Sequence, residues 1–227
     1  MFYRQELCDL GDPVEGKICL KVAGMSMRNS EWTLTGGLAS NHFFDIDNYL
    51  LSEEDAGQLA NLLARKIDFL AKKIGFDKVA VIEKVGPGPI GLIGITYLLK
   101  PLISKGIVIV RPRKKLLLAA IKGNFRKGDR LLILTDVATG GWTIFGAAQK
   151  IWDAGGQVPA ALAVIDRDQG AVVNLGRKGI ELFSLFSAKT MREEKGEELK
   201  KDFRMVIEDR FSPELEDFGG KSATSVF

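Results

Sequence analysis

The sequence predicts an α/β protein with a mostly parallel, open sheet flanked by helices. Four apolar runs of strand length occur at 79–82, 107–110, 131–134 and 160–165, and segments with helical spacing lie between most of them. Strands that alternate with helices form a parallel sheet covered on both faces. The length of 227 residues fits one large α/β unit with an appendage better than two full domains.

The clearest helix is expected at 53–74. Ser52 followed three residues later by Asp55 is similar to a capping box, and leucines and isoleucines then recur at helical spacing up to Gly75. Apolar spacing and flanking glycines predict further helices at 90–99 and 142–153.

The composition excludes several classes of protein. The chain has two cysteines, Cys8 and Cys19, and one histidine, His42, so a zinc site is not expected. Apolar runs of 18 residues are missing, and the first ten residues already carry charges, which predicts neither a membrane span nor a signal peptide. We therefore expect a cytoplasmic protein.

Positive charge is concentrated in one stretch, although the net charge of the whole chain is only +3. Residues 100–130 contain ten lysines and arginines and one acid, Asp129. Such a block suits a surface that binds phosphate or nucleic acid, or a solvated loop between basic strand ends. Because Phe125 is the only aromatic residue within 111–130, stacking platforms for bases are lacking there, and we do not expect a nucleic-acid partner.

The most informative stretch runs from an apolar strand into an acid, a loop of small residues and a helix start. It reads Leu131-Leu132-Ile133-Leu134-Thr135-Asp136-Val137-Ala138-Thr139-Gly140-Gly141-Trp142-Thr143. Backbone N–H groups can point into a loop without bulky side chains, the helix N-terminus adds positive charge, and threonines supply hydroxyl donors. Asp136 follows a strand at the edge where open α/β sheets bind ligands. The stretch fits a phosphate-binding loop; the structural alternative is a turn in which Thr143 caps the helix.

This stretch resembles the signature of the type I phosphoribosyltransferases, in which an apolar strand, two acids and a loop rich in threonine and glycine hold the 5′-phosphate of phosphoribosyl pyrophosphate (PRPP). Among them, the orotate phosphoribosyltransferases are the most similar. Residues 32–45 resemble that family's segment over the base site, 85–91 its glycine-rich loop before a helix, and 165–171 its Asp-Arg-x-x-Gly turn. The resemblance covers residues 30 to 187, in the family's order.

The resemblance implies an enzyme that transfers the phosphoribosyl group of PRPP to orotate. The products would be orotidine 5′-monophosphate and pyrophosphate, in pyrimidine nucleotide biosynthesis. The expected cofactor is Mg²⁺, carried mainly by PRPP because this ion favours phosphate oxygens and retains water. A homodimer is expected as well, since the family's basic loop reaches over the neighbouring subunit's site.

On the donor side, the resemblance assigns catalysis to Asp136, Arg111 and Lys115. Asp136 would contact the ribose hydroxyls and stabilise charge at C1′, while the two cations would face pyrophosphate. The structural alternative is that Asp136 only accepts hydrogen bonds within its loop. The PRPP-binding residues expected are Asp136, Val137, Ala138, Thr139, Gly140, Gly141, Trp142, Thr143, Arg111, Arg113, Lys114 and Lys115.

On the base side, the resemblance assigns Arg167 to the orotate carboxylate, which a planar guanidinium suits. A surface salt bridge to Asp166 or Asp168 is the structural alternative. Aromatic packing on the pyrimidine ring is assigned to Phe43 and Phe44, which could equally fill the core. Thr139 completes the expected base-binding set. His42 is interpreted as a local hydrogen-bonding residue without a catalytic role.

The chain also departs from the family pattern. Thr135 stands where the family has the first of two consecutive acids, and Leu38 where it has a basic residue that touches the ligand. In the basic loop, Pro112 replaces a lysine and Leu117 a histidine, although the two basic residues after Pro112 restore charge nearby. These departures leave two alternatives to the leading interpretation: a non-catalytic regulator that senses PRPP or a nucleotide, and a phosphoribosyltransferase for another base.

The expected organisation is a phosphoribosyltransferase domain at 1–187 and a helical tail at 188–227. The first 50 residues form the hood-like segment that carries the base site. Residues 189–202 mix basic and acidic side chains, which predicts an exposed amphipathic helix.

Overall fold

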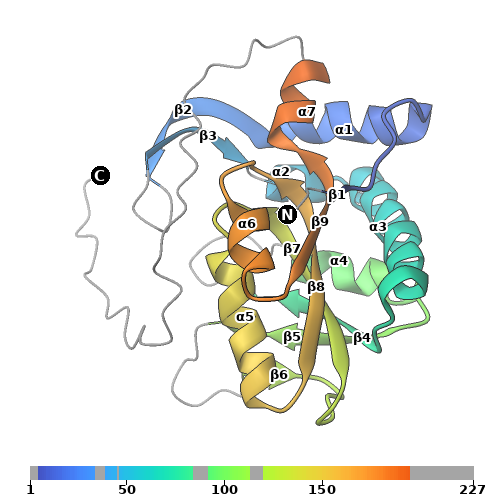
Figure 1. Ribbon diagram of the computed structural model, residues 1–227. Coiled ribbons are helices and arrows are strands. Elements are labelled where there is room, and N and C mark those ends of the chain that lie inside the picture. The colour runs from blue at the N-terminus through green and yellow to red at the C-terminus, as the bar shows by residue number, and fades with distance from the viewer. Residues whose placement is uncertain (1–4, 34–38, 45, 84–91, 113–119, 195–227) are drawn as a thin grey trace, which may run out of the picture.

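A computed structural model of the chain describes residues 5–33, 39–44, 46–83, 92–112 and 120–194 (Figure 1). Within them, a central sheet of seven strands has the order β1-β9-β8-β7-β4-β5-β6. Neighbouring strands run parallel except for the pair of β5 and β6. The strands are β1 (Gln5–Glu6), β4 (Lys78–Ile82), β5 (Gly106–Val110), β6 (Ile121–Lys122), β7 (Arg130–Ala138), β8 (Gln157–Asp166) and β9 (Glu181–Ser187). The expected α/β fold with a mostly parallel sheet is confirmed.

Helices cover both faces of this sheet, which creates two separate apolar cores. Helices α1, α3 and α4 pack on the face that carries Leu132 and Leu134 of β7. Helices α5 and α6 pack on the other face, which carries Leu131 and Ile133. Because side chains alternate along a strand, this continuous apolar run is buried on both sides. The helices are α1 (Pro13–Ser26), α2 (Asp47–Leu50), α3 (Glu53–Ile74), α4 (Leu92–Leu99), α5 (Trp142–Asp153), α6 (Ala171–Gly176) and α7 (Ala188–Glu194).

The predicted helices agree closely with the observed ones. Helix α3 has the predicted bounds, and the Asp55 N–H donates to Ser52 Oγ over 3.4 Å at its start. Gly75 ends it with a φ of 68°, which glycine adopts without strain. Helix α5 also has its predicted bounds, and α4 spans Leu92–Leu99; residues 90–91 of its predicted range lie outside the described part of the chain.

Strand β7 is longer than the apolar run that predicts it. Its pairing with β8 continues to Ala138 opposite Asp166, and the Arg167 N–H then donates to the Ala138 carbonyl over 2.9 Å. Asp136 therefore lies on the last residues of a strand and not in the following loop. The apolar pattern stops at Thr135 because polar side chains emerge at the carboxyl edge while the backbone pairing persists.

The N-terminal segment contains elements that the sequence pattern did not reveal. Helix α1 precedes a separate two-stranded antiparallel sheet of β2 (Met27–Thr33) and β3 (Ala39–Phe44). Figure 1 shows this hairpin at the same end of the molecule as α7, which follows directly from the carboxyl end of β9. The hairpin thus lies at the end of the sheet where ligands of such folds bind.

The start of the C-terminal tail differs from the prediction of an exposed helix. In α7, Ala188, Met191 and Arg192 are buried, and Met191 belongs to the core that also contains α1. Two acids anchor α7: Glu6 accepts from the Ser187 N–H and the Thr190 hydroxyl, and Asp168 accepts from the Lys189 N–H. The charged pattern misled because three residues of this segment pack into the molecule, whereas Lys189 stays exposed. Residues 195–227 lie outside the described residues.

In the part of the chain that the structure describes, a helix both long and apolar enough to cross a membrane is not found. The same residues contain no group of three histidine, cysteine, aspartate or glutamate side chains placed to hold a metal ion. Both cysteines are free thiols, and burial raises the pKa of Cys8 far above its usual range.

Candidate active site

The loop between β7 and α5 requires glycine at its last position. Gly141 precedes the helix with a φ of 86°, a left-handed conformation that other residues adopt only with strain. A Cβ atom there would lie 2.9 Å from Cγ of Leu175 in α6. The loop therefore packs against α6 more closely than a side chain would permit.

The peptide groups of this loop have a fixed orientation. The Thr139 carbonyl accepts from the Ala171 N–H over 3.1 Å, and the Gly140 carbonyl accepts from Asn174 Nδ2 over 3.0 Å. In a trans peptide the N–H points opposite to the carbonyl, and the described residues contain no cis peptide. The N–H groups of Gly140 and Gly141 consequently point away from α6, toward the side where an anion would be held.

The N-terminus of α5 lies beside these N–H groups. Gly141, the residue before the helix, supplies no side-chain cap, and Thr143 is exposed within the first turn. The alternative in which Thr143 caps the helix is therefore wrong. Uncapped N–H groups and the helix dipole favour an anion at this position.

Asp136 is half-buried at the carboxyl end of β7, with one oxygen fixed by local hydrogen bonds. Its Oδ1 accepts from the Val137 N–H over 2.7 Å and from the Thr135 hydroxyl over 3.2 Å. Thr135, which replaces the family's other acid, is itself buried. Thr135 thus orients the Asp136 carboxylate, which lies next to the loop between β7 and α5.

Arg111 belongs to the end of β5, at the root of the basic loop. Its N–H donates to the Ala120 carbonyl over 2.8 Å, which joins the two ends of the segment 112–119 beside the pairing of β5 with β6. Its guanidinium is buried and forms an ion pair with Glu83. Pro112 lies against α5, since a Cβ on Gly146 would be 3.4 Å from Cβ of Pro112. Arg113, Lys114, Lys115 and Leu117 lie outside the described residues.

Arg167 is 2% exposed, so the alternative of a surface salt bridge is wrong. Its guanidinium carbon lies 5.6 Å from the centre of the Phe44 ring, which brings two predicted base-site residues together from β3 and the turn after β8. Burial, and then the charge of Arg192, lowers the pKa of Arg167 to about 10. It remains protonated at neutral pH and can hold an anion. The side chain of Phe43 is not among those described.

The turn that carries Arg167 is itself rigid. Asp166 is buried and its Oδ1 accepts from the Asp168 N–H over 3.0 Å. Asp168 has a φ of 59°, which aspartate tolerates better than most residues. Gly170, with a φ of 100°, then begins α6. Local hydrogen bonds therefore direct Arg167 into the molecule.

The sheet places these residues on one edge. Strands β8, β7, β4 and β5 are neighbours, and their carboxyl ends lead to Arg167, Asp136, Glu83 and Arg111 respectively. Sequence reasoning missed Glu83 and Arg192. An acid directly after the apolar run 79–82, as Asp136 follows 131–134, was a signal for Glu83. Arg192 gave no signal because it lies within a charged stretch.

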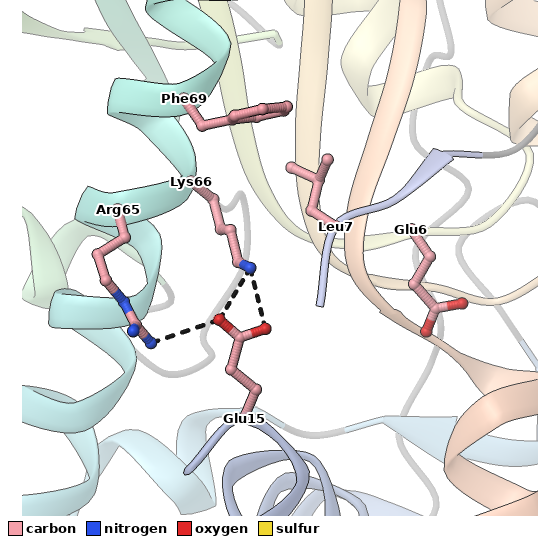
Figure 2. A pocket seen from close by; sticks show the side chains of 6 residues that line it. All are labelled: Glu6, Leu7, Glu15, Arg65, Lys66 and Phe69. Carbon is pink, nitrogen blue, oxygen red and sulfur yellow. Dashed lines mark hydrogen bonds and ion pairs between the residues drawn. The ribbon is translucent and has the colours of Figure 1, made fainter. Parts of the chain in front are cut away.

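A surface cavity of about 460 Å³ lies elsewhere, between β1, α1 and α3. Figure 2 shows Glu15 in it, between Lys66 and Arg65; the Lys66 Nζ to Glu15 Oε1 distance is 2.8 Å. The predicted site residues do not line this cavity. Two acids and two cations line it, and both cations pair with Glu15.

The fold defines the class of protein: the chain has the architecture of a type I phosphoribosyltransferase. It superposes on the crystal structure of orotate phosphoribosyltransferase from Aeropyrum pernix with a TM-score of 0.62 and 26% identity, over 81% of this chain and 99% of that one.

Sequence comparison defines the family. The chain is 31% identical over 156 residues to the orotate phosphoribosyltransferase of Pyrococcus horikoshii, covering 68% of this chain and 80% of that protein. It is 30% identical over 166 residues to that of Methanocaldococcus jannaschii, covering 73% and 89%. No family model matches the chain. The chain belongs to the orotate phosphoribosyltransferase family.

Proposed function

We propose that this protein transfers the phosphoribosyl group of PRPP to orotate, giving orotidine 5′-monophosphate and pyrophosphate. Its family membership supports the reaction type. The buried guanidinium of Arg167 lies against the Phe44 ring, and this observation favours orotate over an uncharged base. A cation beside an aromatic face suits a planar ring that bears a carboxylate.

The donor would bind along the carboxyl edge of the sheet. Its 5′-phosphate would accept hydrogen bonds from the N–H groups of Gly140 and Gly141 and from the first turn of α5. Asp136 would lie beside the ribose hydroxyls, and the diphosphate would face Arg111 with Arg113, Lys114 and Lys115. Mg²⁺ enters with PRPP, because its preferred ligands are phosphate oxygens and water.

The reaction would exchange one bond at C1′ for another. The bond from C1′ to the diphosphate oxygen breaks and its electron pair leaves with pyrophosphate, while the orotate ring nitrogen bonds to C1′ and releases its proton to the solvent. Asp136 would stabilise the positive charge that develops at C1′, and the cations would stabilise the negative charge on the leaving group. Arg167 would hold the carboxylate so that the nitrogen faces C1′.

The test is the ultraviolet absorbance of orotate. We expect it to fall only when orotate, PRPP and Mg²⁺ are present together, and to stay constant with an Asp136→Asn variant of unchanged fold. PRPP binding without turnover of orotate would favour the PRPP-sensing regulator. Turnover of a different base in place of orotate would favour a phosphoribosyltransferase of other specificity.

We further propose that the enzyme is a cytoplasmic homodimer in which the segment 113–119 covers the neighbouring subunit's donor site. Basic residues are concentrated in 100–130, which supports this arrangement of the segment because positive charge attracts an anionic ligand. Light scattering together with the mixed-dimer experiment described below tests the arrangement.

A further inference from the structure

The loop between β7 and α5 contains a peptide group that its own residues do not hold in one orientation. Gly140 and Gly141 are consecutive, so a Cβ atom is missing on both sides of the peptide between them. Rotation of this peptide about its two Cα atoms would turn the Gly141 N–H toward α6 and the Gly140 carbonyl away from it. A group outside the loop must therefore select the orientation that the structure shows.

Hydrogen bonds from α6 make this selection. The Thr139 carbonyl accepts from the Ala171 N–H over 3.1 Å, a bond between backbone groups that does not depend on a side chain. The Gly140 carbonyl, in contrast, accepts from the side chain of Asn174, with 3.0 Å between the oxygen and Nδ2. The orientation of the peptide between Gly140 and Gly141 thus depends on one amide side chain.

Asn174 is buried in a way that packing alone does not explain. The residue is 1% exposed, and its backbone N–H donates to the Gly170 carbonyl over 3.0 Å within α6. Its side-chain Oδ1 is buried as well and has no hydrogen-bond partner among the described residues. A buried acceptor without a donor costs free energy, and an apolar side chain would avoid this cost. The bond from Nδ2 to the loop is the contribution that asparagine makes and an apolar residue could not.

We propose that Asn174 is a positioning residue, which holds the peptide between Gly140 and Gly141 so that its N–H faces the 5′-phosphate of PRPP. This inference rests on the proposed function. Asn174 would not touch the donor, because it binds the carbonyl on the side of the peptide opposite to the anion. Its effect on the phosphate passes through the planar peptide, in which the directions of the carbonyl and the N–H change together.

The experiment compares ribose 5-phosphate with pyrophosphate as ligands of the full-length protein, by titration calorimetry. Asn174→Leu removes the amide donor. We expect the affinity for ribose 5-phosphate to fall roughly 10- to 100-fold, the effect of losing one hydrogen bond to a charged group. The affinity for pyrophosphate, which would bind at the cations of the basic loop, should stay within about twofold of the wild type.

Thermal unfolding separates a positioning role from a structural one. Asn174→Leu also removes the buried acceptor without a partner, so the unfolding temperature should stay level or rise while the phosphate affinity falls. Asn174→Asp keeps the shape of the side chain but places an acceptor against the Gly140 carbonyl. It should lose at least as much affinity for ribose 5-phosphate. If Asn174→Leu does not fold, the smaller Asn174→Ala should show the same selective loss.

Asn61→Leu is the matched control, because Asn61 also donates from Nδ2 to a glycine carbonyl, that of Gly57 in α3, over 2.9 Å. This asparagine is exposed and belongs to a helix remote in sequence from the loop. The variant should leave the affinities for ribose 5-phosphate and pyrophosphate unchanged.

Two results would overturn the inference. Unchanged affinity for ribose 5-phosphate in a folded Asn174→Leu variant would remove the positioning role. An equal loss for pyrophosphate, together with a lower unfolding temperature, would show a merely structural role. In both cases the wild type binds PRPP and the proposed function stands; a wild type that binds neither PRPP nor ribose 5-phosphate would overturn both.

Discussion

Two buried arginines at the carboxyl edge of the sheet have different neighbours. Arg111 forms an ion pair with Glu83, whereas Arg167 lies against the Phe44 ring and within the electrostatic reach of Arg192. A carboxylate neutralises and orients the first cation. The second cation lies over an aromatic ring, and burial and then the charge of Arg192 lower its pKa to about 10. Residue type alone therefore does not define an anion site, because neighbouring side chains change the charge that a cation offers to a ligand.

The largest effect is expected from Gly141→Val, which distorts the loop between β7 and α5. The substitution strains a residue with positive φ and places Cβ 2.9 Å from Leu175, so stability should fall by at least about 1–3 kcal/mol. PRPP affinity should fall by at least about 100-fold, since charge-assisted hydrogen bonds contribute roughly 1.5–3 kcal/mol each. Thermal unfolding and titration calorimetry measure the two losses.

Gly128→Val is the control for backbone strain. Gly128 also has a positive φ of 91°, but no atom lies within 4 Å of a Cβ built there, and it precedes β7 at the opposite end of the sheet. It should lose stability and keep PRPP affinity. Unchanged PRPP affinity in a folded Gly141→Val variant would contradict the phosphate assignment.

The second prediction distinguishes the role of Arg167 from that of Arg111. Arg167→Ala should abolish the preference for orotate over uracil, which lacks the carboxylate, a change of roughly 10- to 100-fold in relative kcat/KM. PRPP binding should survive. Arg111→Ala should do the reverse, weakening the use of PRPP without altering the choice of base.

Arg130→Ala, which removes an arginine from the amino end of β7, controls for loss of one positive charge. Arg130→Ala should change neither the preference for orotate over uracil nor the use of PRPP. If the wild type already used orotate and uracil equally, Arg167 would have no carboxylate to hold and the proposed substrate would be wrong.

A smaller effect concerns which subunit supplies each cation. Arg111 forms an ion pair with Glu83 of its own chain, so we expect it to act within its subunit. A mixed dimer should combine an Asp136→Ala subunit with one in which Arg113, Lys114 and Lys115 are alanine. One of its two sites then has both halves intact, and about half of the wild-type activity should return. No recovery in a verified hybrid would mean that the loop serves its own subunit or none.

The smallest effect is expected from Pro112→Lys. The added cation would stabilise charge that grows on the leaving group, so kcat should rise by at most about tenfold with little change in PRPP affinity. Because Pro112 lies against Gly146 of α5, a small loss of thermal stability should accompany the gain. A flat or lower kcat would indicate a separate role for the leucine-rich loop and favour the PRPP-sensing alternative.

Local signals in the sequence were sufficient to predict several elements. Apolar runs located the central strands, the spacing of leucines located α3, and the glycines after Asp136 located the loop and the start of α5. The sequence pattern did not reveal α1, because Gly16 and Gly24 weaken its helical signal. It did not reveal the β2–β3 hairpin either, because charged and polar residues are mixed with its apolar ones.

The environments of the two arginines could not be predicted without the folded structure. Both follow apolar strands and look alike in sequence, and their neighbours come from distant segments: Glu83 from the end of β4, Phe44 from β3 and Arg192 from α7. The physical reason is the range of the forces involved. Secondary structure follows from hydrogen bonds and side-chain patterns within a few residues, whereas the charge that a site offers depends on side chains that folding brings together across the sheet.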